Sequence, residues 1–130
     1  MSVPVNAKVR AVPNVLACLR AAQGFMVAQD AASAPARFKQ LQAELVKARS
    51  LLCFAPTSGR PTGFLEARTG WGQFQAQQAL QLAQALGLPD LRELVSARHT
   101  LLYAHSARDV LLLSLRHERQ LGYRLAGQAG

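Results

Sequence analysis

Cysteine, acidic residues and aromatic residues are all scarce in this chain. The two cysteines, Cys18 and Cys53, have apolar neighbours, which predicts buried thiols and disfavours a disulfide framework or a zinc site. The three histidines, His99, His105 and His117, do not have the spacing of metal ligands. We therefore expect a protein without a bound metal or other cofactor.

Long apolar runs and a charged-then-apolar leader are also missing. The apolar run at 110–115 is far too short to span a bilayer. The first residues do not have the pattern of a secretory signal. These two absences predict a cytoplasmic protein.

Positive charge is what the chain has in excess. Fifteen lysines and arginines against seven acidic residues give a formal net charge of +8 and a pI near 10.8. This charge favours nucleic acid or an acidic protein as a partner, with an attraction that salt screens. Solvated surface arginines would give the same total charge. Only three of the fifteen are lysines, and arginine binds phosphate and carboxylate groups through paired hydrogen bonds, which favours specific contacts.

Length and composition predict one globular domain over residues 1–130, since half of the residues are hydrophobic. Alternating valines predict an edge strand near 6–12. Pro13 suits the first turn of a helix, and apolar residues recur every three or four positions after it. A second helix follows, with Ser33 as its N-cap. Its apolar stripe consists of Phe38, Leu41, Leu45, Ala48 and Leu52.

The second half of the chain predicts one more helix and three strands. Prolines and glycines interrupt the stretch 55–72, and a glutamine-rich helix with Trp71 and Phe74 follows, closed by Gly87 at its C′ position. Apolar runs at 91–95, at 99–105 and from Val110 onward, separated by polar turns, predict an antiparallel meander. The fold class is therefore α+β, with a helical hairpin beside the sheet.

Several short motifs stand out along the chain: residues 36–52 followed by Pro56 and Gly59-Arg60-Pro61, then residues 92–95, 101–103 and 113–120. Together they resemble the RelE/ParE superfamily of toxins from bacterial type II toxin–antitoxin systems. The first motif looks like the second helix and Gly-Arg-Pro exit of that superfamily, and the other three look like its last three strands. The ending Arg-His-x-Arg-Gln-Leu-x-Tyr is more similar to the ParE branch. The resemblance covers most of the chain, and 64–90 looks like an insertion with an additional helix that compact members lack.

The ParE branch implies a protein that binds DNA gyrase, traps it on broken DNA and is not itself a hydrolase. It also implies an acidic antitoxin as partner, lying along the exposed apolar and basic surface. The implied surface for target or antitoxin consists of Arg98, His99, Arg116, Arg119, Tyr123 and Arg124.

The RelE branch implies a different activity, the metal-independent cleavage of mRNA in the ribosome. Such cleavage needs an acid or base and cations for the strained phosphate. His117 would be the acid or base, Arg116 and Arg119 the phosphate clamps, and Tyr123 a stacking or proton-relay group.

Ordinary structural roles compete with each of these functions. A histidine at a strand end is more often hydrogen-bonded than catalytic, and Tyr103 is expected in the core. Glu93 is expected to pair with Arg92 or with a cross-strand arginine. No nucleophile–base pair, phosphate-binding glycine loop or acidic metal cluster is present in the sequence, so we expect a binding protein more than an enzyme. A basic nucleic-acid-binding module is the third alternative, although few aromatic residues are left for base stacking.

Overall fold

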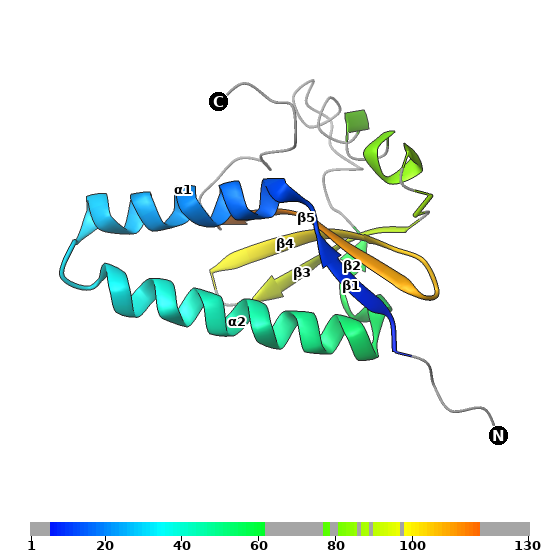
Figure 1. The fold of residues 1–130 in the computed structure, drawn as a ribbon, viewed down its shortest axis with the longest axis horizontal. Helices are drawn as coiled ribbons and strands as arrows, with labels where there is room; N and C mark the ends of the chain where they lie inside the picture. Colours follow the sequence, from blue (N-terminus) through cyan, green and yellow to red (C-terminus); the bar gives the residue numbers. More distant parts are fainter. Residues whose placement is uncertain are drawn as a thin grey trace.

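The computed structural model describes residues 6–61, 77–78, 81–85, 87–88, 90–96 and 98–117. These residues form an α+β fold, in which a strand and two helices precede most of the sheet (Figure 1). The elements are β1 (Lys8–Ala11), α1 (Pro13–Gln29), α2 (Ala34–Phe54), the 3-10 helix η1 (Pro56–Ser58), β2 (Arg60–Pro61), β3 (Asp90–Ser96), β4 (His99–His105) and β5 (Asp109–His117).

Helices α1 and α2 form the predicted hairpin, and Arg37 ties its two arms together. The Arg37 guanidinium donates to the Met26 carbonyl at 3.0 Å and to the Gln29 side chain at 3.1 Å. Ser33 is the N-cap residue of α2, as predicted, although its hydroxyl makes no cap hydrogen bond. That hydroxyl instead accepts from Arg37 Nε and lies within donating distance of the Asp30 carbonyl.

The five strands make one mixed sheet with the order β1-β5-β4-β3-β2. Strands β3, β4 and β5 form the predicted antiparallel meander, and β1 is an edge strand, as predicted. Strand β1 runs parallel to β5, with Lys8 opposite Asp109 and Ala11 opposite Leu112. Strand β2, which the pattern did not predict, pairs only Arg60 and Pro61 with β3.

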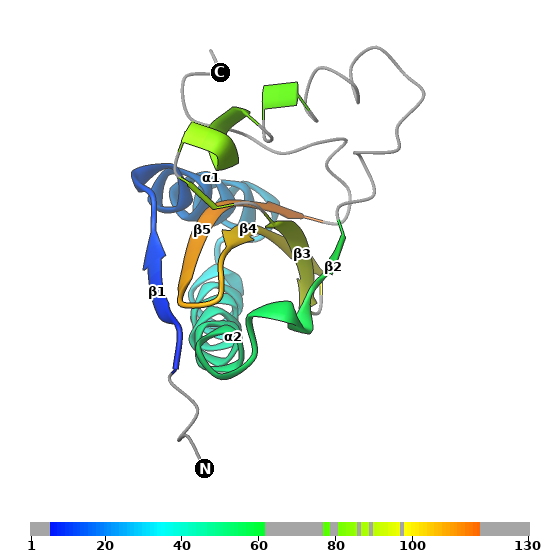
Figure 2. The ribbon, with the colours of Figure 1, turned by 90° about the vertical axis from the view of Figure 1, so that its right-hand side faces the viewer.

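Both faces of the sheet are covered. On one face, residues of α1 and α2 pack with Leu101, Tyr103 and Leu112, and the strands arch over α2 (Figure 2). On the other face, Ala83 and Leu88 pack against a second set of strand residues. All seven residues of β4 are consequently buried, which is why its central residues 101–104 are all apolar and do not alternate with polar ones.

The helical stretch 81–85 therefore contributes to the second core, and Gly87 ends it as predicted. Gly87 has φ +70°. Its N–H donates to the Gln84 carbonyl and the Leu88 N–H to the Ala83 carbonyl, which is the pattern of a Schellman cap. The cap turns buried Leu88 towards the sheet just before β3. The beginning of this predicted helix, including Trp71 and Phe74, lies outside the described residues.

Helix α1 lies along the part of β5 that β1 does not pair. Pairing with β1 ends at Leu112. Beyond it, the Asn14 side chain donates to the Leu113 carbonyl, and Cys18 Sγ lies 3.6 Å from Ser114 Oγ. Cys18 is buried, as predicted, whereas Cys53 is only half-buried, and both thiols are free.

Candidate functional site

A groove lies between the end of the helical hairpin at which α1 is joined to α2 and the end of the sheet at which β4 begins and β5 ends. It has a volume of about 940 Å³, and we call it the hairpin groove. Its walls include Cys18, Phe25 and Met26 of α1, Arg37, Leu41 and Glu44 of α2, and Arg98, His99, Leu115 and His117 from the sheet. Apolar side chains line much of it, together with Gln29, Arg37, Gln40 and Glu44 on the helical side and Arg98, His99 and His117 on the sheet side.

Strand register brings two of the predicted site residues together in this groove. His99 begins β4, His117 ends β5, and their Cα atoms are paired across the two strands. Their rings meet edge to face, with centroids 5.1 Å apart. Arg98, in the turn before His99, is exposed and lines the same groove. Two residues of the predicted binding surface, Arg98 and His99, therefore share one wall with His117, the acid or base of the alternative RNase prediction.

Phe25 extends this cluster onto the helical side. Its ring centroid lies 6.3 Å from that of His117, and the residue is 54% exposed. A large aromatic ring left half in water beside two imidazoles is a typical anchor for a macromolecular partner. Phe25 was not predicted as a site residue, because its position on α1 fits a core stripe as well as a surface.

Arg116 does not line the groove. Successive side chains on a strand point to opposite faces, so Arg116 and His117 diverge. Arg116 Nη2 lies 4.0 Å from Glu93 Oε2, and the Glu93 side chain is buried. The prediction that Glu93 pairs with a cross-strand arginine is therefore confirmed, and Arg116 has a structural partner. Arg119, Tyr123 and Arg124 lie outside the described residues.

Neither a metal site nor a membrane span is found where the structure is described. Among those residues, no three side chains of the His, Cys, Asp and Glu types come together to hold an ion. No helix of the described segments is long and apolar enough to cross a bilayer.

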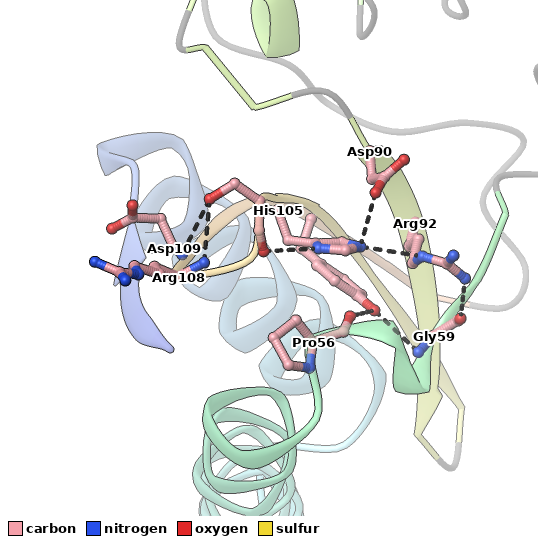
Figure 3. Close-up of polar contacts among 9 residues, drawn as sticks. Pro56, Gly59, Asp90, Arg92, His105, Arg108 and Asp109 are labelled. Atoms are coloured by element: carbon pink, nitrogen blue, oxygen red, sulfur yellow. Dashed lines mark hydrogen bonds and ion pairs between the residues drawn. The ribbon is translucent and has the colours of Figure 1, made fainter. Parts of the chain in front are cut away.

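A second polar cluster lies at the other end of β4 (Figure 3). We call it the His105 cluster; it consists of Pro56, Gly59, Asp90, Arg92, Tyr103, His105 and Ser106. Tyr103 is fully buried, as predicted, and its hydroxyl makes two hydrogen bonds. It donates to the Pro56 carbonyl at 2.6 Å and accepts from the Gly59 N–H at 2.9 Å, which fixes the chain between α2 and β2.

Burial gives the Tyr103 phenol a raised pKa, although the hydrogen bond from Gly59 and the charge of Arg92 oppose the rise. The unfolded phenol ionises from about pH 10 upward, before the folded one does. The free energy of unfolding should therefore fall as pH rises through that range. We expect this fall to be smaller in Tyr103→Phe, as measured by urea unfolding between about pH 9 and about pH 11. Equal pH dependence in the two proteins would contradict the prediction.

Comparison with models of known protein families gives no match, and comparison with curated proteins gives no significant match either. The functional conclusion therefore rests on the residues and geometry of the chain.

Proposed function

We propose that the protein is a ParE-like toxin of a bacterial toxin–antitoxin pair, which inhibits DNA gyrase by binding it. The observation that carries the proposal is the hairpin groove, where Arg98, His99 and His117 line one wall beside a half-exposed Phe25. The order of strand, helical hairpin and antiparallel meander also agrees with what the sequence resemblance implies.

Binding accounts for this groove better than catalysis does. The two imidazoles contact each other edge to face. Among the described residues that line the groove, only Glu44 of α2 has a carboxylate. An acid–base pair for RNA cleavage would need two groups directed at one phosphate. The exposed ring of Phe25 and the positive side chains instead suit a protein surface with apolar and acidic groups.

The same features suit an acidic antitoxin that covers the toxin until it is needed. The net charge of +8 attracts an acidic chain. Large apolar side chains remain exposed on both arms of the hairpin, where an amphipathic helix would bury them. They are Leu16, Phe25 and Val27 of α1, and Val46, Leu51 and Phe54 of α2.

The decisive test is a gyrase supercoiling assay with purified protein. We expect inhibition together with accumulation of cleaved DNA. Charge reversal by Arg98→Glu, or by Arg119→Glu, should abolish both this inhibition and toxicity in growing cells. Because Arg98 is exposed in the turn before β4, Arg98→Glu should leave the fold intact, as judged by an unchanged unfolding midpoint, which is also measured for Arg119→Glu.

Arg108→Glu is the matched control, since Arg108 is an exposed arginine in the β4–β5 turn, away from the groove residues. It makes the same charge change and should leave inhibition intact. Retained toxicity in both Arg98→Glu and Arg119→Glu would overturn the proposal. No effect on gyrase by a large excess of folded protein would redirect the work to translating ribosomes, with His117→Ala as the first variant.

A further inference from the structure

The His105 cluster holds two chain segments that are distant in sequence. Gly59 immediately precedes β2, and Asp90 is the first residue of β3. The Arg92 guanidinium donates through Nη1 to the Gly59 carbonyl at 2.9 Å. His105 Nε2 lies 3.6 Å from Asp90 Oδ2. Gly59 and Asp90, which are 31 positions apart in the sequence, are therefore both in contact with the pair formed by Arg92 and His105.

Hydrogen-bond donors and acceptors define the state of the imidazole. His105 Nδ1 lies 3.1 Å from the Ser106 carbonyl, which can only accept, so Nδ1 carries a proton. Arg92 Nε, which always carries a proton, lies 3.1 Å from Nε2, so Nε2 must accept. His105 is therefore the neutral Nδ1–H tautomer in this arrangement, and the Asp90 carboxylate faces a nitrogen that has no proton to give.

Nε2 thus has two partners that exclude each other. A proton on Nε2 would turn the contact with Asp90 into an ion pair and would place two donors against each other at Arg92. The His105 residue is only 4% exposed, so water cannot readily replace a lost partner. Since the same guanidinium holds Gly59, displacement of Arg92 acts directly on the turn before β2.

We propose that His105 is a proton-operated switch that changes partner between Arg92 and Asp90. In its neutral form it holds Arg92 and, through Arg92, the Gly59 turn. In its protonated form it pairs with Asp90 and releases Arg92. The switch sets how firmly the two-residue strand β2 is attached to β3.

Charged groups of both signs surround the imidazole. Asp90 and Arg92 come from β3, and the Tyr103 ring of β4 lies 5.9 Å from the imidazole ring between centroids. Arg108 in the β4–β5 turn and Asp109 at the start of β5 follow, and their backbone N–H groups donate to Ser106 Oγ (Figure 3). Of these, only Asp90 offers the imidazole a carboxylate within ion-pair distance.

The test is a pH titration of the full-length, ¹⁵N-labelled protein, followed at the histidine ring nitrogens, at Arg92 Nε–H and at the Gly59 amide. At neutral pH we expect the Nδ1–H tautomer for His105. As His105 takes up a proton, the Arg92 Nε–H signal should shift with it, and the protection factor of the Gly59 amide, which corrects for the slower intrinsic exchange in acid, should fall roughly fivefold, the factor for one lost hydrogen bond. An Nε2–H tautomer of His105 at neutral pH, or an Arg92 Nε–H signal that does not shift as His105 is protonated, would overturn the proposal.

Two variants separate the switch from a general effect of acid. Asp90→Asn removes the charge that stabilises the protonated form, and the Asp90 side chain is 58% exposed, so the fold should tolerate it. We expect His105 to protonate at lower pH in this variant, while His99 and His117 at the other end of the sheet titrate as before. Asp109→Asn is the matched control and should have the smaller effect. An unchanged His105 titration in Asp90→Asn would show that Asp90 is not the alternative partner.

Discussion

Replacing Gly59 by alanine is expected to lower the free energy of unfolding by about 3 kcal/mol. The backbone of Gly59 is ordinary, with φ −74° and ψ 167°, so conformation is not the reason. An added Cβ would lie 2.5 Å from Tyr103 Oη and 2.6 Å from the Glu93 carbonyl oxygen. Tyr103 is fully buried and Glu93 belongs to β3, so neither can move without disturbing the sheet.

Urea unfolding of both proteins measures this loss. Gly24→Ala is the matched control, because nothing lies within 4 Å of a Cβ at Gly24. That helix position should gain about 1 kcal/mol from the better helix former. A Gly59→Ala variant as stable as the unmodified protein would mean that the turn can move away from Tyr103 without cost.

Removing only the hydroxyl in Tyr103→Phe is expected to cost about 2–4 kcal/mol. The Gly59 N–H and the Pro56 carbonyl would lose their common partner at a fully buried position. Each buried group left without a hydrogen bond costs about 1–3 kcal/mol. Phenylalanine keeps the ring and its packing, so the loss measured by urea unfolding reports the hydroxyl itself.

The double variant Gly59→Ala, Tyr103→Phe tests whether one contact links the two effects. Without the hydroxyl, the closest clash of the new Cβ disappears, but the clash with the Glu93 carbonyl remains. The combined loss should therefore be smaller than the sum of the single losses and larger than either alone. Strict additivity would show that Gly59 and Tyr103 act independently.

Local pattern was sufficient for the main elements of this fold. The run at 99–105 matches β4, and Pro13 begins α1. These elements are encoded by neighbouring residues: apolar spacing, a proline and a glycine that tolerates positive φ. Strand β2 was missed because two residues, one of them proline, carry no pattern, and only pairing with β3 makes them a strand. Ser33 takes the predicted N-cap position, but its hydroxyl accepts from Arg37 and does not cap the helix.

The candidate site depended more on long-range placement. That Arg98, His99 and His117 lie together follows from meander register, which the sequence suggested. That Phe25 completes the wall, and that Arg116 faces Glu93 instead of the groove, depends on how α1 lies against β5 and on which face each residue takes. The His105 cluster joins residues of η1, β3 and β4, and no local pattern reports a hydrogen bond between such distant segments.

The parallel pairing of β1 with β5 has a consequence for how the chain is made. Strand β1 precedes the other described elements in the chain, but within the described sheet it pairs only with β5, the last of the five strands. Pairing between strands so far apart in sequence is slow, because a long loop must close before the strands make any stabilising contact. On the ribosome, β1 must wait for β5 to emerge, while the helical hairpin can form at once. The sheet wall of the hairpin groove, which includes His117, is thus completed only after β5 has been synthesised.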